Sequence, residues 1–230
     1  MSQLQYTYTP YFCEENIYKL CQQLTGQQDY DGELFAVFIS NEEKLVPILR
    51  QTVEENTGGA VVWDYHVIAV ERTRGTARVY DLTSQLPKPC PLEVYARRGL
   101  GPGTSFRLAR KFRVIPAAQY LEHFGSDRSH MWNQDGIPGW SKPVPPYPAI
   151  IARDGQTHTL PRFWDMEALV DDPRYGRVYS EEAFLSLFGG VIGNGAAGPP
   201  VNAASAGSAF YWGRSSLVCW AATGLICFTI

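Results

Sequence analysis

The sequence contains few cysteines and histidines and lacks the short motifs that identify metal sites and serine hydrolases. Its five cysteines and four histidines include no C-x-x-C pair and no H-E-x-x-H motif, so we expect no metal. No G-x-S-x-G motif is present either, which disfavours a serine hydrolase. The 20 Lys and Arg residues nearly balance the 23 Asp and Glu residues, so we expect no nucleic-acid partner.

Basic residues do gather locally between positions 97 and 113. Because acidic residues offset them elsewhere in the chain, we expect them to lie on a solvated loop face and not to bind phosphate. They are Arg97, Arg98, Arg107, Arg110, Lys111 and Arg113.

The cysteine count and the two ends of the chain bear on its compartment. An odd number of cysteines without the density of a disulfide scaffold, and a first segment without an apolar signal core, favour a reducing setting. We expect the cytoplasm, with the nucleus as an additional location. The apolar run Leu217–Ile230 has 14 residues, fewer than the ~20 that a membrane-spanning helix needs. Membrane contact through this run is therefore not expected.

Length and composition predict one folded domain with a C-terminal extension. A chain of 230 residues that is 45% hydrophobic and 19% charged is typical of a globular protein. After Phe188 the composition changes to Gly, Ala, Pro and Ser, which cannot bury enough apolar surface to fold. We expect a folded domain over residues 1–188, a flexible spacer with an apolar tail over 189–230, and a monomer.

The N-terminal segment predicts a helix that begins near a cysteine. Ile17, Leu20, Cys21 and Leu24 follow the spacing of one helix face, and Gly26 follows as a stop. Cys13 would then lie in the first turn. A helix N-terminus lowers the pKa of a thiol, whereas Glu14 and Glu15 work against the thiolate, so an imidazolium partner would have to supply the larger stabilisation. Packing is the plainer alternative for Cys13.

Strands alternate with loops and short helices over the rest of the domain. Residues 34–40 predict a buried strand, residues 45–51 are ambiguous around Pro47, and residues 60–70 and 77–82 predict a β-hairpin. The later elements that we expect are a strand at 112–115, helices at 117–124, 163–170 and 181–188, and long loops at 99–103 and 136–148.

The predicted hairpin brings two polar residues together. If its turn is centred between Thr73 and Arg74, His66 and Asp81 lie directly opposite each other on the same sheet face. The carboxylate would then reach the imidazole Nδ1–H and leave Nε2 free to accept a thiol proton. The alternative is that His66 is a satisfied, half-buried histidine and Asp81 a strand-end residue.

Five ordered blocks of the sequence resemble the protein N-terminal glutamine amidohydrolase family. The resemblance spans roughly residues 6–188, although residues 97–111 and everything after about Phe188 depart from the family. The blocks are residues 11–21 (YFCEENIYKLC), 36–42 (AVFISNE), 62–67 (VWDYHV), 80–82 (YDL) and 126–131 (SDRSHM).

This resemblance implies a fold, an activity and a set of residues. The fold is α+β, a three-layer α-β-α sandwich related to papain- and transglutaminase-like cysteine hydrolase cores. The activity is hydrolysis of the side-chain amide of N-terminal Gln in proteins or peptides to Glu, without a cofactor, as a step of the N-degron pathway. Cys13, His66 and Asp81 would be the nucleophile, the base and the orienting carboxylate.

Recognition of the substrate's first residue would require a group that binds its free α-ammonium. A carboxylate in a closed pocket could do this, and Glu15, Asp64 and Asp127 are candidates. The backbone N–H of Cys13 is the candidate oxyanion donor. A papain-like cysteine peptidase or a transglutaminase would use the same three residues, and a binding module that has lost catalysis is a third possibility.

Overall fold

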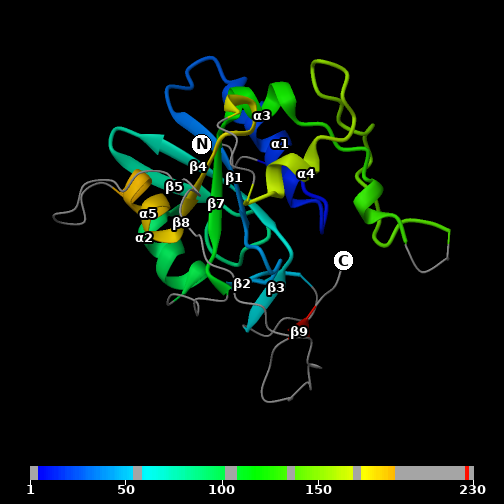
Figure 1. The fold of residues 1–230 in the computed structure, drawn as a ribbon. Helices are drawn as coiled ribbons and strands as arrows, with labels where there is room; N and C mark the ends of the chain where they lie inside the picture. The colour runs from blue at the N-terminus through cyan, green and yellow to red at the C-terminus, as the bar shows by residue number, and fades with distance from the viewer. Residues whose placement is uncertain are drawn as a thin grey trace, which may run out of the picture.

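The computed structural model describes residues 5–53, 59–101, 108–133, 138–167, 172–189 and 226–227. The fold is mixed α+β, and its main sheet has six strands in the order β6-β5-β4-β1-β7-β8, all antiparallel (Figure 1). A smaller sheet has the order β2-β3-β9. The strands are β1 (Glu33–Ser40), β2 (Val46–Leu49), β3 (Ala60–Trp63), β4 (His66–Thr73), β5 (Thr76–Tyr80), β6 (Cys90–Pro91), β7 (Lys111–Pro116), β8 (Arg177–Ser180) and β9 (Ile226–Cys227).

Helices cover both faces of the main sheet (Figure 1). Alternation along β1 explains the two cores, because Ala36 and Phe38 face one of them while Val37 and Ile39 face the other. The first core lies under α1, α3 and α4, and the second lies under α2 and α5. The helices are α1 (Cys13–Thr25), α2 (Leu92–Tyr95), α3 (Ala117–His123), α4 (Leu160–Trp164) and α5 (Glu181–Gly189), with the short turns η1 (Ala96–Leu100), η3 (Ser129–Met131) and η4 (Pro173–Tyr175).

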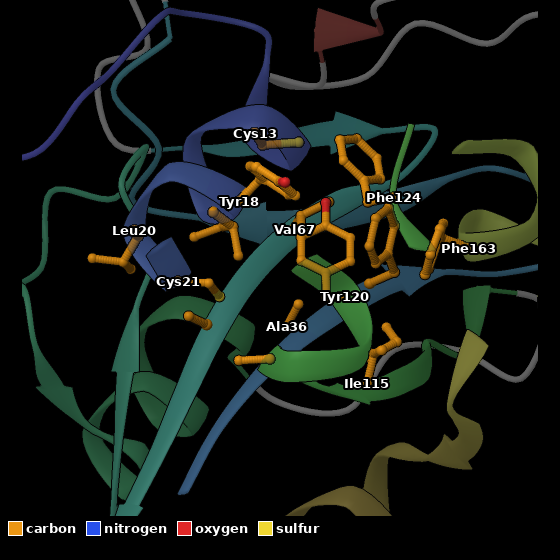
Figure 2. Packing of buried hydrophobic residues seen from close by; sticks show 14 of the residues in the cluster. Cys13, Tyr18, Leu20, Cys21, Ala36, Val67, Ile115, Tyr120, Phe124 and Phe163 are labelled. Atoms are coloured by element: carbon orange, nitrogen blue, oxygen red, sulfur yellow. The ribbon is translucent and has the colours of Figure 1, made fainter. Parts of the chain in front are cut away.

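The first helix agrees with the prediction from its apolar spacing. It begins at Cys13, ends at Thr25 and is followed by Gly26. Its apolar face packs on β4 and β1, with aromatic residues of α3 and α4 beside it. Figure 2 shows Cys13 at the N-terminal end of this helix and Cys21 further along it, with Val67 and Ala36 on the strands beneath. The main sheet therefore fixes the position of the first turn of α1.

The predicted strand over residues 60–70 is wrong, because two strands of different sheets occupy it. β3 ends at Trp63 and pairs with β2, whereas β4 begins at His66 and lies between β5 and β1. At the break, the Asp64 side chain accepts a hydrogen bond from the Tyr65 N–H (2.7 Å), and the Asp64 carbonyl accepts one from Ser40 Oγ (2.7 Å). Such local bonds replace the strand ladder, so His66 stands at the very start of β4.

The hairpin of β4 and β5 is present, but its predicted register is wrong by two residues. Thr73 pairs with Thr76 and Ala69 pairs with Tyr80, so the turn consists of Arg74 and Gly75, both with positive φ (49° and 79°). This is the backbone that two-residue hairpin turns favour. Because the shift is even, it leaves each side chain on the predicted sheet face.

The later elements are partly as predicted. The strand at 112–115 lies within β7, the helices at 117–124 and 181–188 correspond to α3 and α5, and β2 resolves the ambiguous segment around Pro47. The helix expected over 163–170 is wrong for the described residues 163–167: α4 ends at Trp164, because Asp165 turns out of the helix and its carboxylate accepts the Glu167 N–H (2.9 Å). Residues 168–170 lie outside the described residues.

The C-terminal extension lies almost entirely outside the described residues. Gly189 is the last residue of α5. Beyond it only Ile226 and Cys227 are described, as the strand β9, which pairs in parallel with Val61 and Val62 of β3. None of the helices in the described part of the chain has the length and apolar character required to cross a bilayer.

Two of the basic residues expected on a solvated face are buried. Arg110 and Arg113 are each 2% exposed. Arg110 makes a bidentate ion pair with Glu181 (2.8 and 2.9 Å), and Arg113 donates to the backbone carbonyls of Tyr175 and Asp165. The prediction was wrong for these two because their partners come from distant segments. It holds for Arg97 and Arg98, which are exposed; Arg107 lies outside the described residues.

Gly176 connects η4 to β8 at a point where no side chain fits. Its φ is +69°, and a Cβ there would lie 2.1 Å from the carbonyl oxygen of Val114. We expect Gly176→Ala to lower the free energy of unfolding by about 2–4 kcal/mol, measured by urea denaturation. Gly155→Ala is the matched control, because its φ is +86° but no atom lies within 4 Å of the added Cβ. Equal losses in the two variants would contradict the steric part of this expectation.

Candidate active site

Cys13 is the first residue of α1 and is held there by the segment before it. The Asn16 side chain accepts from the Thr9 N–H and donates to the Thr9 carbonyl, both at 2.8 Å, and Phe12 at the N-cap is completely buried. The N-cap supplies no side-chain hydrogen bond. Phe12 therefore does not cap the first N–H groups of the helix, and the thiol stands at the positive end of the helix dipole.

His66 and Asp81 form a buried hydrogen-bonded pair. His66 Nε2 lies 2.9 Å from Asp81 Oδ1, and the two residues are 0% and 2% exposed. The second oxygen of Asp81 accepts from Gln51 Nε2 and from the Tyr95 hydroxyl, both at 2.9 Å. The Trp63 ring stacks on the imidazole, with centroids 5.0 Å apart. The Asp81 carboxylate, held in place by Gln51 and Tyr95, thus holds the His66 imidazole in position.

The predicted contact between these two side chains is present, but at the other ring nitrogen. We expected the carboxylate at Nδ1, whereas it binds Nε2. Within the described part of the chain, Nδ1 has no hydrogen-bond partner. A carboxylate at Nε2 favours the tautomer that carries its proton there, so Nδ1 is the nitrogen that can accept a proton.

The surroundings of Asp81 keep it ionised. Burial alone would raise the pKa of this carboxyl, but the charge of His66 and the hydrogen bonds from His66, Gln51 and Tyr95 together lower it below its ordinary value. A carboxylate at this position stabilises a positive charge on the neighbouring imidazole.

Cys13 reaches the same region but bonds to a different residue. Its thiol lies 3.6 Å from Glu14 Oε2. The charges of Cys13 and Asp81 both act on the Tyr8 hydroxyl, so the thiol and the pair of His66 with Asp81 lie near the same tyrosine. No hydrogen bond joins Cys13 to His66 among the residues that the structure describes. The structure brings His66 and Asp81 together and leaves the thiol turned toward Glu14.

The thiol is protonated in this arrangement. Burial raises the pKa of Cys13 well above its ordinary value, and the neighbouring Glu14 carboxylate raises it further, while the Val67 N–H acts in the opposite direction. The Glu14 carboxylate thus disfavours the thiolate, as predicted from the sequence.

Glu14 is the residue of this site that sequence reasoning missed. Its side chain is completely buried, and Oε2 accepts a hydrogen bond from the Tyr65 hydroxyl (3.1 Å). Oε1 lies 3.5 Å from His130 Nε2, although the two atoms make no hydrogen bond. In the sequence, its position beside Cys13 indicates only a charge at the helix end, not a contact with the thiol.

Glu15, one of the candidates for binding the substrate ammonium, is already paired with Arg128. Arg128 donates to both of its oxygens, at 2.8 and 2.9 Å, and Glu15 is completely buried. Its oxygens thus have a cation already, and its position ties the loop that follows Ser126 to α1.

This ion pair carries a stability prediction. We expect Glu15→Gln to lower the free energy of unfolding by about 3–5 kcal/mol, because it leaves the Arg128 guanidinium buried without its counter-charge. Thermal unfolding followed by circular dichroism should show a fall in Tm of about 10 °C. Glu42→Gln removes an exposed pair with Lys111 and should change the stability by less than about 1 kcal/mol. A Tm equal to wild type in Glu15→Gln would show that the buried pair contributes nothing.

The other two candidates for binding the ammonium occupy different places. The charge of Asp64 acts on the thiol. Burial raises the pKa of Asp64, with the Glu14 charge acting in the same direction and the charge of His130 lowering it. Asp127 lies in the loop after Ser126 and is bonded to His158 Nδ1 (3.1 Å) and to the Ser129 N–H (2.9 Å). Its side chain is 40% exposed, and of these two residues Asp64 is the one whose charge acts on the thiol.

Taken together, these residues form a site suited to acyl transfer. A thiol at a helix start and an imidazole fixed by a carboxylate are the groups that hydrolases with a nucleophile and a base use. Within the described ranges, no three His, Cys, Asp or Glu side chains converge as metal ligands.

Comparison with known proteins identifies the family. The model of the N-terminal glutamine amidase family matches residues 8–188, and the chain belongs to this family. Three similar proteins, each named protein N-terminal glutamine amidohydrolase, come from Arabidopsis thaliana (41% identical, over 71% of this chain and 76% of that protein), Danio rerio (41%, over 80% and 90%) and Homo sapiens (39%, over 79% and 87%).

Proposed function

We propose that this protein hydrolyses the side-chain amide of an N-terminal glutamine in proteins or peptides, which yields glutamate and ammonia. The proposal rests on the buried bond between His66 and Asp81 and on the position of Cys13 at a helix start, in a chain whose relatives are named for this reaction. We assign Cys13 as the nucleophile, His66 as the proton carrier and Asp81 as the carboxylate that orients the imidazole.

The reaction needs two stages and no cofactor. Cys13 Sγ attacks the carboxamide carbon while its proton passes to His66 Nδ1, and the imidazolium then gives this proton to the departing amide nitrogen, which leaves as ammonia. Water then loses a proton to His66 and attacks the resulting thioester, the C–S bond breaks, and the thiol regains the proton. The free Nδ1 and the carboxylate on Nε2 support this assignment of the two ring nitrogens.

The negative oxygen of each tetrahedral intermediate requires a donor. The backbone N–H of Cys13 is our candidate, because it stands at the start of α1, where the first N–H groups have no intrahelical acceptor. The dipole of the same helix favours negative charge at this point.

We extend the proposal to the fold, the domain bounds and the location of the protein. Helices cover both faces of an antiparallel sheet, a cysteine stands at a helix start, His66 begins β4, and Asp81 directly follows the neighbouring β5. These features support our inference of an α-β-α sandwich related to papain-like and transglutaminase-like cores. The family match over residues 8–188 supports a catalytic domain over 1–188, with 189–230 as an appendage. We place the enzyme in the cytoplasm, as a monomer that feeds glutamate termini into the N-degron pathway.

Mass spectrometry of synthetic peptides tests this function. We would incubate the protein with peptides that carry Gln at the first position, Gln at an internal position, or Asn at the first position. A gain of about one dalton confined to the first peptide is expected, because replacement of NH2 by OH is the only net change that the mechanism allows. Backbone cleavage would favour a peptidase instead, and coupling to an added amine would favour a transglutaminase.

A further inference from the structure

A buried carboxylate without a full set of partners lies next to the proposed nucleophile. Glu14 is completely buried, and Oε2 contacts the Cys13 thiol (3.6 Å) and the Tyr65 hydroxyl (3.1 Å). Within the described residues, Oε1 makes no hydrogen bond. A buried charged oxygen without a hydrogen bond is costly, so its retention at this position requires a reason.

The polar and charged groups around Glu14 come from four elements. Asp64 and Tyr65 lie between β3 and β4, His130 belongs to η3, and the Tyr120 hydroxyl of α3 donates to the Glu14 backbone carbonyl (3.0 Å). On α1 itself are Cys13 and Glu15, and Arg128 is bound by Glu15.

These groups leave one carboxylate oxygen of Glu14, next to the Cys13 residue, without a hydrogen bond in the described part of the chain. His130 Nε2 lies 3.5 Å from Glu14 Oε1, and it too makes no hydrogen bond in the described part of the chain. Glu14 and Asp64 contribute two carboxylates, whereas the nearby guanidinium of Arg128 is held by Glu15. A ligand with several N–H donors and a positive charge would satisfy Oε1.

We propose that Glu14, assisted by Asp64, accepts the α-ammonium of the substrate's first residue, and that this pairing releases the Cys13 thiol to His66. The inference rests on the proposed function and specifies how a free N-terminus is distinguished from an internal glutamine. In glutamine only three carbons separate the α-nitrogen from the carboxamide carbon. A carboxylate in contact with the nucleophile is therefore at the right range to hold one while the thiol attacks the other.

The same contact explains how the nucleophile would be switched. Without substrate, the thiol bonds to Glu14, and both burial and the Glu14 charge keep its pKa high. An ammonium at Glu14 cancels that charge and competes for its oxygens, so the thiol proton can pass to His66 Nδ1. The nucleophile is thus activated after a free N-terminus has bound.

The first test compares two substrates in wild type and in Glu14→Gln. The substrates are one peptide that begins with Gln and the same peptide with an acetylated N-terminus. Wild type should strongly prefer the free amine, and Glu14→Gln should reduce the ratio of the two kcat/KM values by roughly 100-fold, the scale of a lost buried charge pair. Glu71→Gln is the matched control, because Glu71 is a buried glutamate of β4 (5% exposed) bonded to Arg78 and Tyr80, and it should keep the wild-type ratio.

The second test reads the thiol directly and needs no substrate. Iodoacetamide labelling of Cys13 at pH 7, followed by mass spectrometry of its tryptic peptide, should be about tenfold faster in Glu14→Gln. Removal of the neighbouring charge lowers the thiol pKa, and a fall of one unit raises the thiolate fraction about tenfold. A purely structural role of Glu14 would change stability without this acceleration.

The outcomes separate this inference from the function on which it rests. If wild type does not deamidate the free-amine peptide, the proposed function fails, and labelling alone then reports whether Glu14 holds the thiol. If wild type is active and a folded Glu14→Gln keeps the wild-type ratio, the inference is overturned. Should Glu14→Gln not fold, Asp64→Asn must lower the ratio about tenfold, and an unchanged ratio there also overturns it.

Discussion

Replacement of Cys13 by alanine is expected to reduce kcat/KM for an N-terminal Gln peptide by roughly 10⁴–10⁶-fold, the range seen when a hydrolase loses its nucleophile. The stability should change little, because Cys13 lies at the end of its helix and makes one weak side-chain hydrogen bond, to Glu14. Steady-state ammonia release, with Tm measured in parallel, checks both statements.

A second cysteine of the same helix provides the control. Cys21 is completely buried two turns further along α1 and packs in the same core (Figure 2). Cys21→Ala should lower the free energy of unfolding by about 1–2 kcal/mol through the lost packing and leave kcat/KM close to wild type. If Cys13→Ala retained more than about a hundredth of the activity, the thiol would not be the nucleophile.

The second large effect is expected at Asp81. Asp81→Asn should reduce kcat by roughly 10³–10⁴-fold with little change in KM, as in a triad whose imidazole is held in the wrong tautomer. Asp81 accepts hydrogen bonds at both oxygens, from His66, Gln51, Tyr95 and the Thr83 N–H. An asparagine amide must turn its NH₂ group toward some of these donors, and toward His66 it would drive the ring proton to Nδ1.

A milder variant shows whether the charge or the packing is responsible. Tyr95→Phe removes one hydrogen bond to Asp81 Oδ2 and keeps the carboxylate, so kcat should fall less than about tenfold. Comparison of pH–rate profiles adds a second readout, because Tyr95→Phe should retain the profile of wild type. Equal losses of kcat in the two variants would indicate that Asp81 acts only through local packing.

The sequence predicted those features that depend on short-range patterns. The helix over Cys13–Thr25 follows from the spacing of its apolar residues. The contact of His66 with Asp81 was found despite a wrong register, because an error of two residues preserves the sheet face. Which imidazole nitrogen the carboxylate binds depends on the ring rotamer, which residue type and strand pairing do not determine.

Features that depend on long-range partners could not be predicted. The apolar run over residues 60–70 does not indicate where one sheet ends and the other begins, because buried strands of either sheet have the same composition. Glu14 and Glu15 are equivalent in the sequence. Arg128, more than a hundred residues away, pairs with one of them and leaves the other to face the thiol.

The start of α1 concentrates four different tasks in four consecutive residues. Cys13 carries the proposed nucleophile, Glu14 faces the proposed ammonium position, Glu15 anchors Arg128, and Asn16 holds Thr9. Each residue points about 100° around the helix axis from its predecessor, so the four contacts diverge to different parts of the molecule. Insertion or deletion of a single residue here would rotate every one of them to the wrong neighbour. This segment of the gene should therefore tolerate far fewer changes than its length suggests, and a saturation mutagenesis library would show it as an isolated block of intolerance.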